Sequence, residues 1–225
     1  MYSVNNGSKS RLRKADDAYH HGDLRNALLG VARRLLDEGG QEGLSLRELA
    51  RLAGVSANAP YRHFASRDEI LAEVAAQGFG ELSARFDAHQ ADIQANRLVG
   101  MCDVYTEFAL EQPAMYRVMF GAEKQALMEF EVLQQAAYSC FGRLVAATID
   151  AYGGGHPEEA ATLARASAIW ALVHGWSRLA IDGVTCFLPT EAVAPASVPA
   201  RAVIESWRSK EPARKQISRS PKLQR

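Results

Sequence analysis

The 225-residue sequence has few cysteines and no long apolar run. Its three cysteines, Cys102, Cys140 and Cys186, lack the paired spacing of a zinc site or a redox dithiol. We therefore expect free thiols in a reducing cytoplasm, and neither a metal nor another cofactor. No apolar run reaches about 18 residues and the N-terminus is polar, which indicates neither export nor a membrane span.

The sequence also lacks an excess of charge of either sign. Lys and Arg number 26, as do Asp and Glu, so the formal net charge at pH 7 is zero. The overall charge therefore indicates no polyanionic partner, and any affinity for nucleic acid has to come from local clusters of basic residues. Hydrophobic residues make up 48% of the chain, which is typical of a globular protein with a sizeable core.

What the sequence does contain is a helix-turn-helix pattern in its N-terminal third. Ser45 and Glu48 have the spacing of a capping box, which predicts a helix start at Ser45. Gly54 suits the left-handed residue of a tight turn after this helix, and Ser56 is a second N-cap, opening a short helix over 57–64. The apolar residues of the first helix recur at helical spacing: Leu46, Leu49, Ala50 and Ala53.

The short second helix has an apolar side and a polar side. Helical spacing predicts that three residues point inward: Ala57, Pro60 and Phe64. Asn58, Tyr61 and Arg62 are expected to face outward. An amide can pair with a base edge, a guanidinium with guanine or phosphate, and a phenol hydroxyl with phosphate, so this side suits the major groove of DNA.

Two motifs in this region carry a resemblance to a known family. They are Leu46-x2-Leu49-Ala50-x3-Gly54-Val55-Ser56 and Tyr61-x2-Phe64-x2-Arg67-x2-Ile70-Leu71. From Tyr19 to Phe79 the chain resembles the DNA-binding domain of TetR/AcrR-type transcriptional regulators. Pro60 departs from the family pattern of Leu, Ile or Val, and Ala59 stands where many members carry Thr. Because proline removes a helical hydrogen bond, the second helix starts either at Ala57 or later, with Asn58 as its cap.

The resemblance and the helical spacing together give the residues expected to contact double-stranded operator DNA. They are Ser45, Arg47, Ser56, Ala57, Asn58, Ala59, Tyr61, Arg62, His63 and Arg67. Asp68 and Glu69 favour a helix start near Ser66, whose N–H groups could also hold a phosphate. The alternative to DNA binding is a helical hairpin of an ordinary α-domain.

A further predicted helix precedes this pattern, and both ends of the chain are basic. The helix after Tyr19 has an apolar stripe that ends at Gly39-Gly40 and consists of Leu24, Ala27, Leu28, Val31, Ala32, Leu35 and Leu36. We interpret His20 and His21 as surface or phosphate-proximal histidines, because neighbours on a helix do not share a face and so make a poor metal site. Residues 1–18 and 208–225 are predicted to be disordered basic segments, either solvated or in contact with DNA.

The rest of the chain predicts a second helical domain. A helix after Phe64 reaches about Phe86 and contains the boundary between a DNA-binding domain (19–80) and an effector-binding and dimerisation domain (81–207). In TetR-like proteins this element links the effector domain to the DNA reader, so a tilt would change the spacing of the two recognition helices. The further predicted helices are 98–110, 114–121, 124–152, 157–182 and 201–207.

Trp170, His174 and Gly175 resemble the signature of the "WHG" subgroup of TetR C-terminal domains, and residues 115–121 fit the same subgroup. This resemblance implies a ligand-binding and dimerising domain without naming the ligand. Gly175 inside a helix costs about 1 kcal/mol relative to alanine, which indicates close packing at that point. The residues expected to contact the effector, unless they belong to the core, are Met101, Tyr105, Phe108, Met115, Tyr116, Met119, Phe120, Trp170 and His174.

The resulting prediction is an all-α protein with an N-terminal three-helix helix-turn-helix domain and a C-terminal helical ligand-binding and dimerisation domain. The helices 124–152 and 157–182 either form a four-helix interface with a second copy or pack only within one subunit. We expect a cytoplasmic homodimeric repressor that a small apolar effector releases from a palindromic operator. No nucleophile and base occur at a recognisable spacing, which disfavours an enzyme. The remaining alternative is a helical protein-interaction or effector-binding relative that has lost specific DNA binding.

Overall fold

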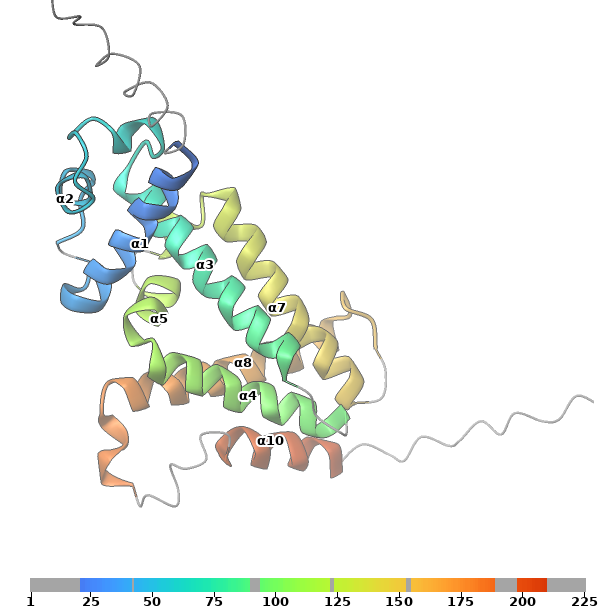
Figure 1. The fold of residues 1–225 in the computed structure, drawn as a ribbon. Coiled ribbons are helices and arrows are strands. Elements are labelled where there is room, and N and C mark those ends of the chain that lie inside the picture. The colour runs from blue at the N-terminus through green and yellow to red at the C-terminus, as the bar shows by residue number, and fades with distance from the viewer. Residues whose placement is uncertain are drawn as a thin grey trace, which may run out of the picture. The chain divides into compact units, whose positions relative to one another are not determined.

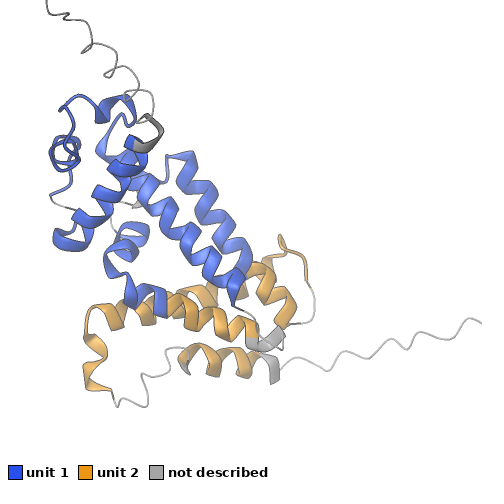
Figure 2. Cartoon of the chain, in the orientation of Figure 1, with its two compact units in different colours: residues 1–89, 107–144 blue, residues 90–106, 145–225 orange. Residues whose placement is uncertain are grey.

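The computed structural model describes residues 21–41, 43–89, 94–121, 124–152, 155–188 and 198–209. Within these residues every regular element is a helix, which confirms the all-α prediction (Figure 1). The chain divides into two compact units, which are described separately (Figure 2). Unit 1 comprises residues 1–89 and 107–144, and unit 2 comprises residues 90–106 and 145–225. The predictions for the basic arm, for His20 and for the tail from Lys210 onward lie outside the described residues.

Unit 1 contains the predicted helix-turn-helix. Its elements are α1 (His21–Gly39), α2 (Leu46–Leu52), the 3-10 helix η1 (Pro60–Arg62), α3 (Arg67–Ala88), α5 (Pro113–Phe120) and α6 (Lys124–Leu127). Two further helices, α4 (Gln94–Glu111) and α7 (Glu131–Ala151), have residues in both units. The core of α3 is the predicted one, with the side chains of Ile70, Leu71, Val74, Phe79, Leu82 and Phe86 all buried.

The apolar face of α1 is broader than the stripe predicted for it. Leu29, which was not predicted to be inside, is buried together with Leu28, Val31, Ala32 and Leu36. The prediction was wrong at Ala27, which is exposed. The physical reason is that α1 contacts three helices of unit 1, α2, α3 and α5, so its buried surface covers more of the helix circumference than one narrow stripe.

Helices α3 and α5 approach each other closely at Gly78. A Cβ atom built at Gly78 would lie 2.6 Å from Met119 Sδ and 2.7 Å from Met115 Sδ. Real Cβ atoms do not tolerate such distances without a shift of the neighbour, so the absence of a side chain at this position permits the crossing.

The single helix predicted over 124–152 is wrong, because the chain turns between α6 and α7. The side-chain amide of Gln134 donates to the carbonyl oxygen of Met128 at 2.6 Å. The Phe130 N–H donates to Leu127 O at 3.1 Å, which is the spacing of a tight turn. A side chain thus takes the place of a backbone partner, and α7 begins anew at Glu131.

Unit 2 contains α8 (Ala160–Ile181), the 3-10 helix η2 (Val184–Phe187) and α10 (Val198–Ser209), together with the unit 2 residues of α4 and α7. The predicted start of α8 at Pro157 was wrong, because residues before Ala160 form a turn in which the His156 N–H donates to the Glu159 carboxylate at 3.3 Å. In α10 the helix extends beyond the predicted 201–207 at both ends. None of the helices described is apolar over a length that would cross a bilayer.

Candidate nucleic-acid interface

The first helix of the helix-turn-helix begins where its cap predicts. Ser45 Oγ accepts a hydrogen bond from the Glu48 N–H at 3.2 Å, and α2 starts at the next residue. The Glu48 carboxylate accepts from Arg51 Nη2 at 2.7 Å and from Arg51 Nε at 2.9 Å. This side-chain bond lowers the pKa of Glu48 and raises that of Arg51. Both charges therefore persist at neutral pH, and Arg51 is oriented on the exposed side of α2.

The turn after α2 also forms as its sequence predicts. Gly54 has a φ of +69°, which is the left-handed region that favours glycine. Around it, the Val55 N–H donates to the carbonyl oxygen of Ala50 at 3.0 Å. This bond satisfies a carbonyl at the helix end, so the chain reverses direction within a few residues.

The second helix of the motif differs from its prediction. Only Pro60–Arg62 are helical, as the 3-10 turn η1, and neither Ala57 nor Asn58 opens a helix. Because Pro60 has no N–H, it cannot donate to Ser56 O, and the Ala59 N–H donates to that oxygen instead, at 2.9 Å. The cap of η1 is therefore Ala59 rather than Ser56 or Asn58, and it makes no side-chain cap bond.

The polar residues of this segment lie on its outer side. Pro60 and Phe64 are buried, as predicted, and Asn58, Tyr61 and Arg62 are exposed, with Tyr61 at 52%. Ala57 was predicted to point inward, but it is exposed because the chain at this residue precedes the helical turn. We call the segment from Ser56 to Phe64 the reading turn. Its contact with DNA stays a prediction.

The other residues expected to contact DNA take two kinds of position. Exposed ones are Ser45, Arg47 and Ser56, and half-buried ones are Ala59, His63 and Arg67. Arg67 has a structural partner, because its Nη2 donates to the carbonyl oxygen of Gln41 at 3.0 Å and so joins the start of α3 to the turn after α1. The α3 start is also capped, with Ser66 Oγ accepting from the Glu69 N–H at 3.1 Å.

Sequence reasoning missed two arginines that belong to this region. Arg51 was detectable, because Glu48 and Arg51 have the i, i+3 spacing of a helical ion pair. Arg25 was not detectable from local spacing. Its guanidinium carbon lies 5.2 Å from the centre of the Phe64 ring and its Nη2 pairs with the Glu73 carboxylate on α3, so Arg25 supports the inner side of the reading turn.

The nine residues expected to contact an effector divide between the two units. In unit 2, Tyr105 OH is 3.0 Å from His174 Nδ1, and Trp170 Nε1 donates to Tyr105 OH at 3.4 Å. Met101 is buried in the same unit. The remaining five, Phe108, Met115, Tyr116, Met119 and Phe120, belong to unit 1.

The unit 1 members of that set pack in a core. Met115 and Met119 lie against Gly78, and the Phe120 ring centre is 5.3 Å from that of Phe79 and 4.9 Å from that of Tyr116. These contacts favour the core alternative for this part of the set. The prediction of close packing at Gly175 is wrong for contacts within one chain. A Cβ atom built at this residue would meet no described atom within 4 Å.

Comparisons with known proteins agree with this arrangement. The protein-family model described as "Bacterial regulatory proteins, tetR family" matches residues 28–74, which contain α2, the turn and η1. The model described as "Tetracyclin repressor-like, C-terminal domain" matches residues 98–198. The chain belongs to the TetR family. The expected family resemblance is thereby confirmed, while the "WHG" subgroup stays a prediction.

Individual relatives of this TetR-family chain are distant. The HTH-type transcriptional regulator Rv1816 of Mycobacterium tuberculosis is 30% identical over 116 residues, which are 50% of this chain and 49% of that protein. The chain thus spans about half the length of the curated relatives it matches. A solved protein of unknown function from Rhodococcus sp. RHA1 is 30% identical with a TM-score of 0.69, covering 82% of this chain and 97% of that one. The TetR family regulator PfmR of Thermus thermophilus shares the fold, with a TM-score of 0.54 and 21% identity over 79% of this chain and 94% of that one.

Proposed function

We propose that this TetR-family chain is a DNA-binding transcriptional regulator whose reading turn contacts the operator. The observation that carries the proposal is the exposure of Asn58, Tyr61 and Arg62 on a turn whose other side is anchored by buried Pro60 and Phe64. Amide and guanidinium groups on an exposed segment can reach base edges, whereas a hydroxyl nearby can bind phosphate. The name of the relative Rv1816, an HTH-type transcriptional regulator, supports the same function.

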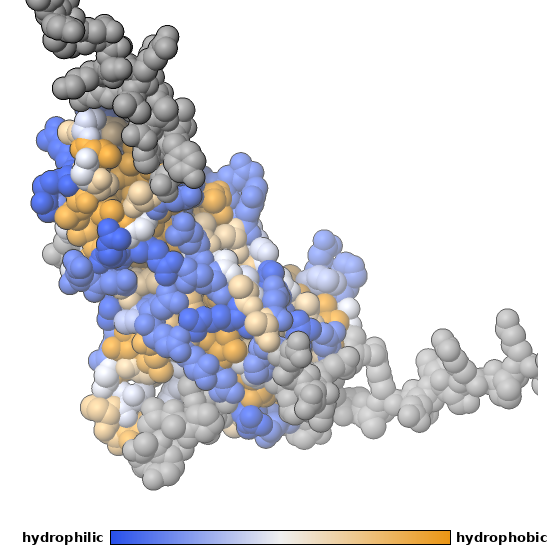
Figure 3. Space-filling view, in the orientation of Figure 1, coloured by the Kyte–Doolittle hydropathy of each residue, from blue (hydrophilic) through white to orange (hydrophobic). Residues whose placement is uncertain are grey.

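We propose further that the regulator is a homodimer that joins through α7 and α8. Gly142 on α7 and Gly175 on α8 both have open space where a Cβ would lie, as far as the described residues show. A glycine inside a helix costs about 1 kcal/mol, a cost that a close crossing with a second copy would explain. Unit 2 also exposes the apolar side chains of Leu179 (45%) and of Phe187 in η2 (75%). Figure 3 shows apolar surface over η2.

Dimerisation would give the protein enough contacts for selectivity. A single reading turn meets only a few base pairs, whereas two copies related by a two-fold axis read both halves of a palindromic operator. Sedimentation equilibrium of the wild type and of Gly175→Leu tests this step. A dimer that Gly175→Leu converts to a folded monomer supports it, and a wild-type monomer at micromolar concentration contradicts it.

We propose that unit 2 takes a small apolar effector near Tyr105, Trp170 and His174. Their hydrogen bonds join α4 to α8 and bring a few polar groups together, and a small number of convergent polar groups is typical of a ligand site. An effector that binds one arrangement of these helices more tightly would shift the protein toward it and release the operator, which makes the regulator a repressor.

Footprinting on DNA that flanks the protein's own gene, followed by titration at several salt concentrations, tests the function. A regulator gives a protected palindrome, a marked preference for that site and a steep salt dependence. Weak binding that does not distinguish this site from random DNA would instead support a relative that has lost specific DNA binding.

A further inference from the structure

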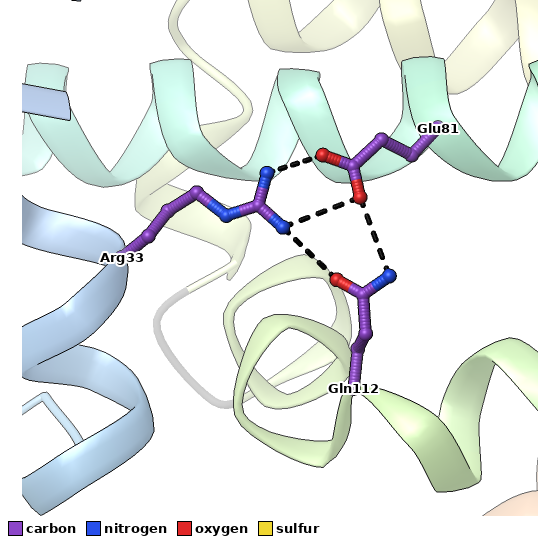
Figure 4. A network of polar contacts seen from close by, with 3 residues as sticks. All are labelled: Arg33, Glu81 and Gln112. Carbon is purple, nitrogen blue, oxygen red and sulfur yellow. Dashed lines mark hydrogen bonds and ion pairs between the residues drawn. The ribbon is translucent and has the colours of Figure 1, made fainter. Parts of the chain in front are cut away.

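Three side chains from different elements of unit 1 form a closed network (Figure 4). Arg33 of α1 makes two contacts with the Glu81 carboxylate of α3, one of them from Nη2 at 3.2 Å. The same Nη2 donates to Gln112 Oε1 at 3.0 Å, and Gln112 Nε2 donates to Glu81 Oε2 at 3.3 Å. Each side chain therefore contacts the other two, and all three are half-buried.

The network contains one of two Arg–Glu pairs that join α1 to α3 among the described side chains. The other is the Arg25–Glu73 pair, and both pairs join residues that are 48 apart in the chain. The two pairs lie eight residues apart on each helix, which is about 12 Å along a helix axis. Two Arg–Glu pairs in the same register prevent α1 from sliding along α3. Since Arg25 also contacts the Phe64 ring, the position of α1 on α3 also affects the position of the reading turn.

Gln112 brings a different part of the chain into this arrangement. It follows Glu111, the last residue of α4, and is the N-cap residue of α5. The same α4 carries Tyr105, which contacts His174 and Trp170 of α8. Tyr105 and Gln112 are seven residues apart, about 10 Å along the helix direction. The last turns of α4 thus connect the Tyr105 contacts to the Gln112 amide along the chain.

We propose that Gln112 is a positioning residue that makes the placement of α1 and the reading turn depend on the end of α4. The inference rests on the proposed function and adds its regulation. A glutamine suits this role, because its amide accepts from Arg33 and donates to Glu81 at the same time. Its bonds depend strongly on geometry, so a small shift at the end of α4 moves the Gln112 amide and with it the Arg33 and Glu81 side chains that it holds.

The test uses the full-length protein and a DNA site that the wild type enriches from a random-sequence library. Operator affinity is measured for Gln112→Ala, Glu81→Gln, Gln112→Glu and the exchange variant Glu81→Gln/Gln112→Glu. The control is Asp87→Asn, which removes a two-bond ion pair with Arg143 from α3 without touching α1. Hydrogen exchange of the amides in residues 46–64 is measured for the same proteins.

Each single network variant is expected to weaken operator binding by about threefold or more, the scale of one partly exposed ion pair or hydrogen bond. The exchange variant is expected to return to within about twofold of the wild type, since the closed network of one carboxylate, one amide and Arg33 is restored. Asp87→Asn is expected to leave operator affinity unchanged. Amide exchange in residues 46–64 should increase in Gln112→Ala and stay at the wild-type rate in Asp87→Asn.

The outcomes separate this inference from the proposed function. A wild type that enriches no DNA sequence overturns the proposed function, while the exchange rates still decide the role of Gln112. A wild type that binds its site, with Gln112→Ala indistinguishable from Asp87→Asn in affinity and amide exchange, overturns this inference alone. An exchange variant as weak as the single variants also overturns it, because the network would then not be the cause.

Discussion

The close approach of α3 and α5 at Gly78 gives a prediction with a built-in control. Gly78 and Gly80 lie two residues apart on the same helix, yet a Cβ at Gly78 would sit 2.6 Å from Met119 Sδ, whereas one at Gly80 would meet no described atom within 4 Å. Replacing a helical glycine by alanine gains about 1 kcal/mol of helix propensity at either position. The substitutions Gly78→Ala and Gly80→Ala therefore differ only in what the new methyl group meets.

At Gly80 the gain in propensity stands alone, so Gly80→Ala should raise the unfolding free energy by about 1 kcal/mol. At Gly78 the added methyl forces Met115 and Met119 to move, and overpacking of a core costs about 1–3 kcal/mol. Methionine side chains are flexible, which places the cost toward the lower end. The net effect of Gly78→Ala is a loss of up to about 2 kcal/mol, so the two variants should differ by about 1–3 kcal/mol.

Urea unfolding followed by circular dichroism measures this difference. For a chain of this size 1 kcal/mol corresponds to a change of about 2–4 °C in Tm, so thermal unfolding provides a second reading. An unchanged m-value shows that the comparison concerns folded-state stability. If Gly78→Ala were stabilised as much as Gly80→Ala, α3 and α5 would not meet at Gly78, and the account of this core would be refuted.

Three further predictions concern DNA binding and thiol chemistry. Asn58→Ala should weaken operator binding by about 1–3 kcal/mol and random-DNA binding much less, and an equal loss on both DNAs in a filter-binding assay would contradict base reading. Arg67→Ala should weaken binding to both DNAs and reduce the salt slope by about one. It should also lower the urea midpoint of unfolding, because it removes the bond to Gln41 O. An unchanged midpoint would contradict that bond. Burial raises the pKa of Cys102 to about 12. At pH 8 iodoacetamide should therefore modify exposed Cys186 and leave Cys102 unmodified, which peptide mass spectrometry measures. Comparable modification rates for both thiols would show that Cys102 is not buried.

The parts of the fold that follow from neighbours in the chain were predictable. The α2 start at Ser45, the turn at Gly54 and the α3 start at Ser66 depend on bonds that span only a few residues. Such bonds form from local residue types whatever surrounds them, which is why capping and turn rules identified the helix-turn-helix. The inward side of the reading turn was predictable for a related reason, since Pro60 and Phe64 are apolar at helical spacing.

Other features were not predictable because they depend on one particular side chain or a distant partner. The break between α6 and α7 follows from the Gln134 amide reaching Met128 O, although the sequence there is compatible with one continuous helix. Ala57 is exposed because the helical part of the reading turn is shorter than periodicity suggested. The set of apolar residues proposed to bind an effector proved to divide between two units, because hydrophobicity alone does not distinguish a core from a pocket.

The sequence by itself determined the helical class, the helix-turn-helix and the polar character of its outer face. These depend on periodicity, caps and turn residues, which act over a single helical turn or two. Only the tertiary structure decided that Arg25 and Arg33 meet Glu73 and Glu81, and that Gln112 joins the second pair. The residues of each Arg–Glu pair are 48 apart, and no local rule selects one carboxylate among 26 acidic side chains until the helices pack.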